Sequence, residues 1–221
     1  CLNLTVEFDM TSQKSDIVIR NAQLIDGTGS PMATGDLAIK GDRICAMGDL
    51  KNWHGNQEID ACGKTLAPGF IDVHTHDDRA LLADPLMACK VNQGVTTVIT
   101  GNCGVSLAPI KLHGYPPPPL DILSPNRSDF FARFKDYLGA LSNEPPAVNA
   151  ACQVGHSSLR AETMDNLDRQ ASASEIKAMR KRLEQAMEDG AIGMSTGLFY
   201  KPAREAATSE VIELAKSLPR Y

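Results

Sequence analysis

The chain has 221 residues, 43% of them hydrophobic, and a formal net charge of -5. This balance is typical of a globular protein with a real core, while scattered basic residues in an acidic chain argue against nucleic-acid binding. No run approaches the ~18 apolar residues of a membrane span, and six irregularly spaced cysteines do not resemble a small secreted disulfide framework. We therefore expect a small-molecule partner, no nucleic-acid or membrane partner, and a cytoplasmic location.

The first fifteen residues precede the patterned part of the chain, which begins at Asp16. Leu2–Asp9 has neither the basic start nor the long apolar core of a secretory signal. We interpret residues 1–15 as a disordered or vector-derived leader, with Met10 as the natural start. An N-terminal cysteine such as Cys1 is also typical of a processed lipoprotein, which is the alternative.

Residues 16–66 contain short strand-like runs separated by glycine-containing turns. The runs are Ile17–Ile19, Gln23–Asp26, Asp36–Lys40, Arg43–Gly48 and Glu58–Asp60. This pattern predicts a small β-sandwich or sheet.

Residues 67–221 alternate between strand-like and helical segments, which predicts an α/β fold with a parallel sheet. The expected strands are Phe70–His76, Val95–Thr100, Ala147–His156 and Ala191–Thr196. The expected helices are Asp84–Gln93, Asp129–Leu141, Ser174–Asp189 and Ser209–Leu218. The proline run Tyr115–Pro119 predicts an exposed loop, since proline can neither join a ladder nor continue a helix.

Two histidines one residue apart, His74 and His76, lie where the first of these strands is expected to end. Alternate side chains of a strand share a face, with Cα atoms about 6.6 Å apart, so two imidazoles there can close on one cation. Neutral imidazole is a common zinc ligand. The alternative is a polar strand end, but the turn signal Ala67–Gly69 and the charged exit Asp77–Arg79 place the pair where a buried strand stops.

The cysteines divide into two groups by their neighbours. Four of them lie among apolar residues and are expected to be buried thiols: Cys45, Cys62, Cys89 and Cys152. Cys103 is different because it lies between Gly101 and Gly104, directly after the second expected strand.

Four ordered segments resemble the N-acyl-D-amino-acid deacylase branch of the amidohydrolase superfamily, over its N-terminal half. They are Ala67–Asp78, Thr100–Gly104, Gly155–Arg160 and Ser195–Pro202. The resemblance implies a distorted (β/α)8 TIM-like barrel, with about the first four βα units in residues 67–221. It also implies a β-sandwich to which residues 16–66 contribute. Catalytic residues of such barrels lie at the C-terminal ends of the strands.

The same resemblance implies a metal site. Cys103 matches a cysteine that holds a tightly bound zinc, and His74 and His76 would face a second, more weakly occupied position. A buried thiol is the alternative for Cys103. Tyr200 matches a tyrosine that hydrogen-bonds the substrate carbonyl, or it is a loop residue that caps the fourth strand. The catalytic aspartate is expected beyond Tyr221, in a missing C-terminal half, so this chain alone is expected to be inactive.

Five further polar residues lie near the expected strand ends and are candidates for substrate contact or for support of the ligands. They are Asp77, Asp78, His156, Ser157 and Arg160. A lone histidine such as His156 is also common as a structural residue, and Arg160 could meet a carboxylate of substrate or of protein.

The function implied is zinc-dependent hydrolysis of N-acyl-D-amino acids, including N-acyl-D-glutamate, to a carboxylate and a free D-amino acid. One alternative is a cyclic-amide hydrolase of the dihydropyrimidinase or hydantoinase type, against which Cys103 argues because a lysine-borne metal bridge is expected there. The other is a catalytically silent scaffold of the same fold, against which the retained histidine pair argues.

Overall fold

The computed structural model describes residues 13–220, which form two compact units that meet in sequence between Pro68 and Gly69. The sequence-based boundary, between residues 66 and 67, lies two residues earlier. Most of the predicted leader falls outside the described residues, and its last three positions, residues 13–15, belong to the first strand.

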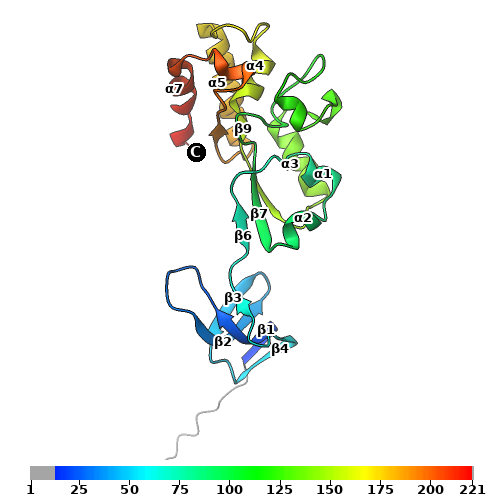
Figure 1. Ribbon diagram of the computed structural model, residues 1–221, viewed down its shortest axis with the longest axis vertical. Helices are drawn as coiled ribbons and strands as arrows, with labels where there is room; N and C mark the ends of the chain where they lie inside the picture. Colours follow the sequence, from blue (N-terminus) through cyan, green and yellow to red (C-terminus); the bar gives the residue numbers. More distant parts are fainter. Residues whose placement is uncertain (1–12, 221) are drawn as a thin grey trace, which may run out of the picture. The chain divides into compact units, whose positions relative to one another are not determined.

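Unit 1, up to Pro68, is a single five-stranded sheet (Figure 1). Its strands are β1 (Gln13–Leu24), β2 (Ala33–Lys40), β3 (Arg43–Gly48), β4 (Trp53–Asp60) and β5 (Thr65–Leu66). The order is β3-β2-β1-β4, and β5 also pairs with β1. The β1–β2 and β2–β3 pairs are antiparallel, whereas β4 and β5 run parallel to β1.

The core of unit 1 is small, and a partly buried arginine side chain supports it. Val18, Ala38 and Leu50 form the buried cluster. The Arg20 guanidinium bonds Asp36 at 3.1 Å and Glu58 at 3.1 Å. These carboxylates come from β2 and β4, on the two sides of β1, so Arg20 ties three strands together.

Unit 2, from Gly69 onward, contains two small parallel sheets. The strands β6 (Phe70–Asp72), β7 (Val95–Thr100) and β8 (Asn149–Cys152) form one sheet in that order. After Gln153, β9 (Val154–Gly155) pairs with β10 (Met194–Ser195). The parallel arrangement predicted from the alternation of segments is therefore present.

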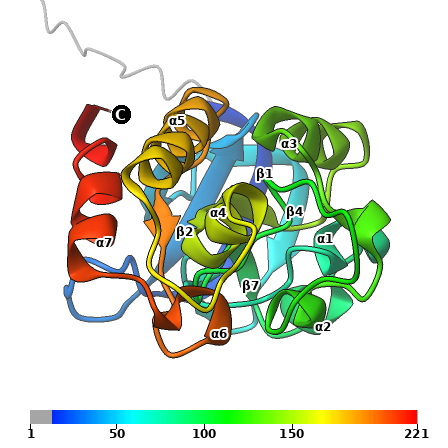
Figure 2. The same ribbon diagram turned by 90° about the horizontal axis from the view of Figure 1, so that it is seen from above.

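Helices connect these strands. They are α1 (Ala80–Ala83), α2 (Ala88–Val91), α3 (Phe134–Asn143), α4 (His156–Thr163), α5 (Ala173–Glu188), α6 (Lys201–Arg204) and α7 (Thr208–Ala215), with short 3-10 turns at Leu120–Ile122, Arg127–Asp129 and Leu218–Arg220. Helix α5 packs against α4 and α7 (Figure 2). No helix among residues 13–220 is long and apolar enough to cross a membrane.

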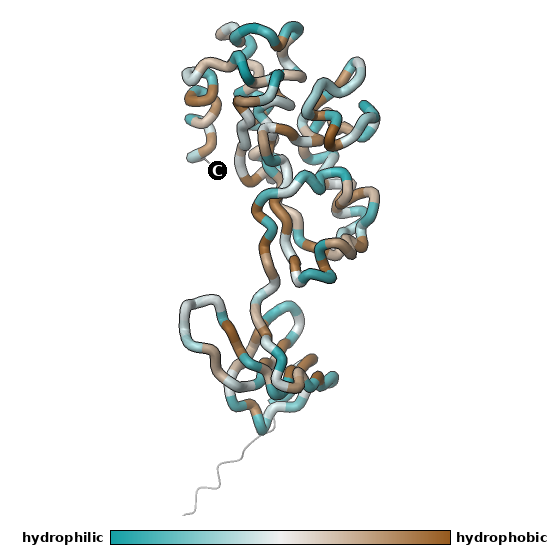
Figure 3. Tube along the Cα trace, in the orientation of Figure 1, coloured by the Kyte–Doolittle hydropathy of each residue, from teal (hydrophilic) through white to brown (hydrophobic). Residues whose placement is uncertain are grey.

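The core of unit 2 lies between the strands and these helices, and Figure 3 shows hydrophobic stretches along the strands. Fully buried members include Leu81, Val98, Leu107, Leu159 and Leu183. Apolar residues of α5 recur at helical spacing and bury one face, because positions three or four apart lie on the same side of a helix.

Sequence-based expectations differ from the structure at several points, including the helix expected over Asp84–Gln93, which spans only Ala88–Val91. The first strand of unit 2 ends at Asp72 rather than His76, and His156 begins α4 rather than ending a strand. Of the four cysteines expected to be buried, only Cys152 is; Cys45, Cys62 and Cys89 are exposed. Cys45 lies on β3, where alternate positions face solvent, whereas Cys62 lies in a turn and Cys89 on α2, so apolar neighbours in sequence did not bury them.

Ser172 closes a capping box at the start of α5. Its hydroxyl accepts from the Glu175 N–H, and the Glu175 carboxylate accepts from the Ser172 N–H at 2.8 Å. Ser172→Ala is expected to lower the free energy of unfolding by about 1 kcal/mol, because it leaves a backbone donor of the first turn unpaired. Urea denaturation would measure this. Ser142→Ala, which removes only an exposed hydroxyl bond to Leu138, is the control; equal losses in both variants would contradict the capping role.

Candidate metal centre

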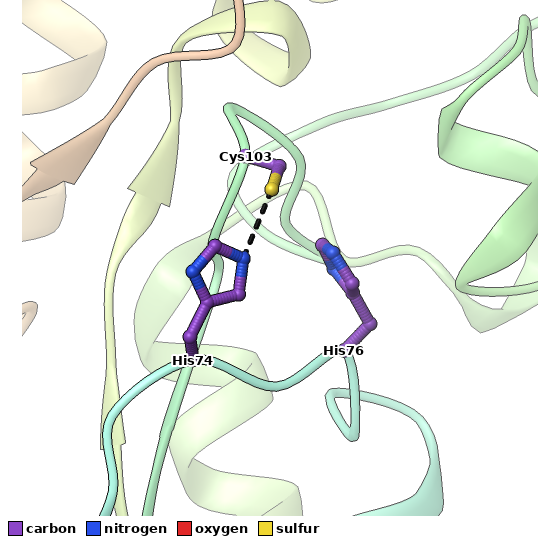
Figure 4. Close-up of side chains that lie close together, drawn as sticks. All are labelled: His74, His76 and Cys103. Carbon is purple, nitrogen blue, oxygen red and sulfur yellow. Dashed lines mark hydrogen bonds between the residues drawn. The ribbon is translucent and has the colours of Figure 1, made fainter.

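Three side chains with metal-binding atoms converge in unit 2. The ligand atoms of His74, His76 and Cys103 all lie within 4.8 Å of one another. Nε2 of His74 lies 3.0 Å from Sγ of Cys103, and the two imidazole rings are nearly perpendicular, with centroids 5.9 Å apart. Figure 4 shows the three groups pointing toward one another. The sequence-based candidates for metal ligation are thus brought together.

The parallel pairing of β6 and β7 explains this convergence. Asp72 pairs with Val98 in the ladder, so both chains leave the sheet at the same edge. The histidines lie on the irregular segment that follows β6, and Cys103 lies on the loop that follows β7. Because parallel strands end on the same side of a sheet, residues 29 positions apart in sequence become neighbours.

Close backbone approach holds the Cys103 loop against its surroundings. Cys103 has a positive φ of 54° and is flanked by Gly101 and Gly104, also at positive φ. A Cβ atom at Gly104 would lie 2.7 Å from the Gly197 nitrogen, and one at Gly197 would strike the Cys103 carbonyl oxygen. Glycine is therefore required at position 104 by contact as well as by conformation, and at position 197 by contact.

Asn102 joins the Cys103 loop to the histidine segment. It is 7% exposed, and its side-chain amide donates to the Thr75 carbonyl at 3.3 Å and to the Ile99 carbonyl at 2.7 Å. Thr75 lies between the two histidines. The position of Cys103 relative to His74 and His76 is thus set by hydrogen bonds as well as by packing.

The electrostatic environment favours the ligand form of one histidine. Burial, together with the neighbouring His74, lowers the pKa of His76. A lowered pKa favours the neutral imidazole, which is the form that binds metals. Burial also raises the pKa of the Asp78 carboxyl to about 7, against hydrogen bonds from the Gly101 and Leu107 backbone.

His156 and Arg160 lie elsewhere, in a fully buried ion-pair network. Both nitrogen-to-oxygen contacts from Arg160 Nη1 to the Glu210 carboxylate measure 2.6 Å, and His156 Nε2 lies 2.8 Å from Glu210 Oε1. Arg160 also donates to the carbonyls of Pro202 and Arg169. The carboxylate that Arg160 meets is therefore one of the protein. Sequence reasoning missed Glu210, although an acidic residue within the amphipathic segment 209–218 was the available signal.

Ser157 and Tyr200 are tied to the Cys103 loop indirectly. The Ser157 N–H donates to the Gly104 carbonyl at 2.7 Å. Tyr200 precedes α6, is 36% exposed, and donates its N–H to the Gly197 carbonyl at 3.0 Å. Because Gly197 lies against Cys103, the tyrosine belongs to the loop that packs on the candidate ligand.

Gly197→Ala is expected to displace the Cys103 loop and reduce the zinc bound at equilibrium, because the new methyl group would overlap the Cys103 carbonyl. Metal content after dialysis against a fixed zinc concentration would measure the loss. Gly193→Ala is a matched control, since nothing lies within 4 Å of a Cβ atom there. Undiminished zinc in the Gly197 variant would show that the contact does not position Cys103.

The profile of the amidohydrolase family matches residues 57–220, and the chain belongs to that family. Within it, D-aminoacylase of Alcaligenes xylosoxydans xylosoxydans is 53% identical over 210 residues, which cover 95% of this chain and 43% of the relative.

Two solved structures match the described fold. A D-aminoacylase studied for its binuclear metal center superposes with a TM-score of 0.89 at 52% identity, covering 92% of this chain and 43% of that one. An N-acyl-D-glutamate deacylase from Bordetella bronchiseptica, complexed with zinc and a phosphonate inhibitor, superposes with a TM-score of 0.89 at 40% identity. The match covers 94% of this chain and 44% of that one. The chain thus spans less than half the length of these relatives.

Proposed function

We propose that this chain forms part of a zinc-dependent hydrolase that cleaves the amide bond of N-acyl-D-amino acids and releases a carboxylate and a free D-amino acid. The observation that carries the proposal is the convergence of the ligand atoms of His74, His76 and Cys103. The 53% identity to D-aminoacylase supports it. Because the chain spans 43% of that relative, the activity is assigned to a longer protein, and residues 1–221 alone are expected to be inactive.

The three side chains fit zinc by donor type and by spacing. Tetrahedral zinc, with bonds of about 2.0–2.3 Å, separates its nitrogen and sulfur ligands by about 3.3–3.7 Å. The ligand atoms here lie within 4.8 Å, and the shortest imidazole-to-thiol distance is 3.0 Å. Movements below about 1 Å would therefore bring these donors to zinc-bonding spacing, around one ion or around two adjacent ones. Imidazole with thiolate is also the donor set that zinc prefers.

We assign Cys103 to a tightly bound zinc, with His74 and His76 facing a second position of weaker occupancy. The binuclear center of the solved D-aminoacylase supports two positions. Asp77, Asp78 and Ser157 would support these ligands from behind. His156 and Arg160 both contact the buried Glu210 carboxylate, so neither is assigned a substrate contact.

When bound, zinc would supply Lewis-acid polarisation of the acyl carbonyl and acidify a water molecule to a pKa of about 7. The Tyr200 hydroxyl would donate a hydrogen bond to the carbonyl oxygen as negative charge develops there. Its half-exposed position beside the Cys103 loop supports this role. An aspartate outside these 221 residues would carry the proton to the departing amine.

We further propose that β6, β7, β8–β9 and β10 are the first four strands of a (β/α)8 barrel, and that unit 1 contributes one layer of a β-sandwich. The parallel order of the strands supports the barrel. An apolar groove of about 320 Å³ on the unit 1 sheet, lined by residues such as Leu37, Ile44 and Met47, supports a second sandwich layer that would cover it.

The substrate class is tested by incubating the full-length protein with N-acetyl-D-leucine, N-acetyl-D-aspartate, N-acetyl-D-glutamate, their L enantiomers and hydantoin. Release of free amine from one or more D substrates, with none from the L forms, is expected. Ring opening of hydantoin without deacylation would identify a cyclic-amide hydrolase instead. Absence of turnover on all of them, with zinc bound, would favour the scaffold.

Tyr200→Phe is expected to lower kcat about 100-fold with a small change in KM, because the hydrogen bond strengthens only as charge develops on the substrate oxygen. Steady-state kinetics on the best D substrate would measure it. Tyr115→Phe, on an exposed loop, is the control. An unchanged kcat in the Tyr200 variant would remove this residue from the proposed mechanism.

A further inference from the structure

The segment that carries the two histidines has little backbone pairing of its own. Strand β6 stops at Asp72, and the following residues have no regular secondary structure. Beyond the strand, the Thr75 N–H makes a long bond of 3.4 Å to the Ile99 carbonyl. The Asn102 amide bonds the Thr75 carbonyl, and a further interaction with the residues around the histidines is needed to keep both imidazoles in place.

A single ammonium group supplies that interaction. Nζ of Lys90 lies 2.7 Å from Asp72 Oδ2, 2.9 Å from Asp77 Oδ2 and 3.3 Å from Thr75 Oγ1. Its side chain is only 18% exposed. Asp72 and Thr75 accept hydrogen bonds from this ammonium, and Asp77 forms an ion pair with it.

The three partners of Lys90 lie on both sides of each histidine in the sequence. Asp72 lies two residues before His74, Thr75 lies between the histidines, and Asp77 follows His76. The segment is thus gathered around Lys90 by oxygens that alternate with the two imidazoles. Asp72 also accepts from the His74 N–H at 3.2 Å, which links the ion pair directly to that histidine's backbone.

Lys90 is itself held firmly. It lies on α2, which begins after Met87, a residue that is 1% exposed and belongs to the core of unit 2. The hydrogen bonds to Asp72 and Asp77 outweigh burial and raise the pKa of Lys90, so the ammonium stays charged. Without this cation, two carboxylates of like charge would lie together and repel.

We propose that Lys90 is a positioning residue of the metal centre, which holds His74 and His76 opposite Cys103 before the metal arrives. The inference rests on the metal site of the proposed function. It concerns a residue that contacts none of the three ligands and acts through the oxygens that flank them.

Removal of the Lys90 ammonium changes metal affinity in opposite directions, depending on whether Lys90 orients the ligands or acts only through its charge. Removing a positive charge near a bound cation raises the affinity for that cation by Coulomb's law. Loss of a group that orients the ligands lowers it, typically by about 10–100-fold. Lys90→Met keeps the aliphatic stem and removes only the ammonium, so the sign of the change identifies which effect dominates.

The experiment titrates Co²⁺ and Zn²⁺ into the full-length protein and its Lys90→Met variant. We expect the zinc affinity of the variant to fall about 10–100-fold, and the cobalt ligand-field bands to change shape while the thiolate charge-transfer band persists. Lys90→Arg, which retains charge and donors, is expected to recover part of the affinity. Lys216→Met is the matched control, because Lys216 pairs only with the exposed Glu213.

Unchanged or increased zinc affinity in Lys90→Met, with wild-type cobalt bands, would overturn the inference. If Lys90→Met does not fold, Thr75→Val tests the inference instead, because it removes one of the three oxygens and keeps both ion pairs. A several-fold loss of zinc affinity is then expected, and an unchanged affinity would overturn the inference. Failure of the unaltered protein to bind either metal would instead overturn the proposed metal site.

Discussion

Replacement of Cys103 by serine is expected to reduce zinc affinity by at least about 1,000-fold, more than the 10–100-fold typical of residues that only support ligands. Thiolate is a far better zinc ligand than a serine hydroxyl, which stays protonated near neutral pH. The same variant is expected to lose deacylase activity to the same extent. The backbone strain at φ 54° is unchanged, because both side chains carry a Cβ atom.

Equilibrium dialysis with a chromogenic chelator would measure the zinc affinity, and the loss of the cobalt thiolate band would confirm which ligand was removed. Cys89→Ser is the matched control, because Cys89 is an exposed free thiol of the same unit. Retention of stoichiometric zinc by the Cys103 variant would remove this residue from the ligand set and leave His74 and His76 as the remaining candidates among the described residues.

Replacement of Glu210 by glutamine is expected to lower the free energy of unfolding by about 3–5 kcal/mol, because it leaves the buried Arg160 charge without its counter-ion. Arg160 and Glu210 are 0% and 1% exposed. Glu213→Gln is a close control on the same helix, where the exposed pair with Lys216 is expected to contribute less than about 1 kcal/mol. The double variant Arg160→Met/Glu210→Met is expected to regain most of the loss.

The stabilisation by Glu210 is expected to depend on pH in a defined direction. Burial raises the pKa of Glu210, but the hydrogen bonds from His156 and Arg160 outweigh it and leave the pKa lowered in the folded protein. Stability from this group is therefore fully present above the unfolded-state pKa of about 4.3 and is lost as pH falls through the lower folded-state value. The difference between wild type and Glu210→Gln should narrow below about pH 4.

Far-UV circular dichroism is the suitable probe for this comparison, since the single tryptophan, Trp53, belongs to unit 1 and does not report on the network. A constant difference between the two proteins from pH 7 to pH 3 would contradict the ion-pair explanation. A loss in Glu210→Gln no larger than that in Glu213→Gln would do so as well.

Several elements were predictable because their signals are local. The strand Val95–Thr100 was predicted with the bounds that the structure has, since a β-branched run between glycines leaves few alternatives. Helix α5 lies within one residue of its predicted bounds, because both the spacing of its apolar residues and the residues that start and stop it are local features of the sequence. The parallel pairing followed from the alternation of such segments.

The sequence predicted which residues are candidate metal ligands, but not the contacts that hold them together. The spacing of His74 and His76 suggested strand alternation as the cause of their proximity, yet the strand ends before them. Lys90 and Asn102 hold the segment instead. Neither contact has a sequence signature, because it depends on how α2 and the β7 loop pack against the end of β6.

By itself, the sequence determined the alternating α/β pattern, the glycines around Cys103 and the types of ligand available, because periodicity, turn chemistry and donor atoms are properties of short segments. Only the tertiary structure decided that Cys103 meets His74, that Lys90 contacts the oxygens of residues 72, 75 and 77 around the histidines, and that Arg160 meets Glu210 rather than a substrate. These contacts join residues 13 to 50 positions apart. Parallel strand register and close backbone approach at glycine bring Cys103 to His74. The other two contacts depend on the packing of helices α2, α4 and α7, which carry Lys90, Arg160 and Glu210.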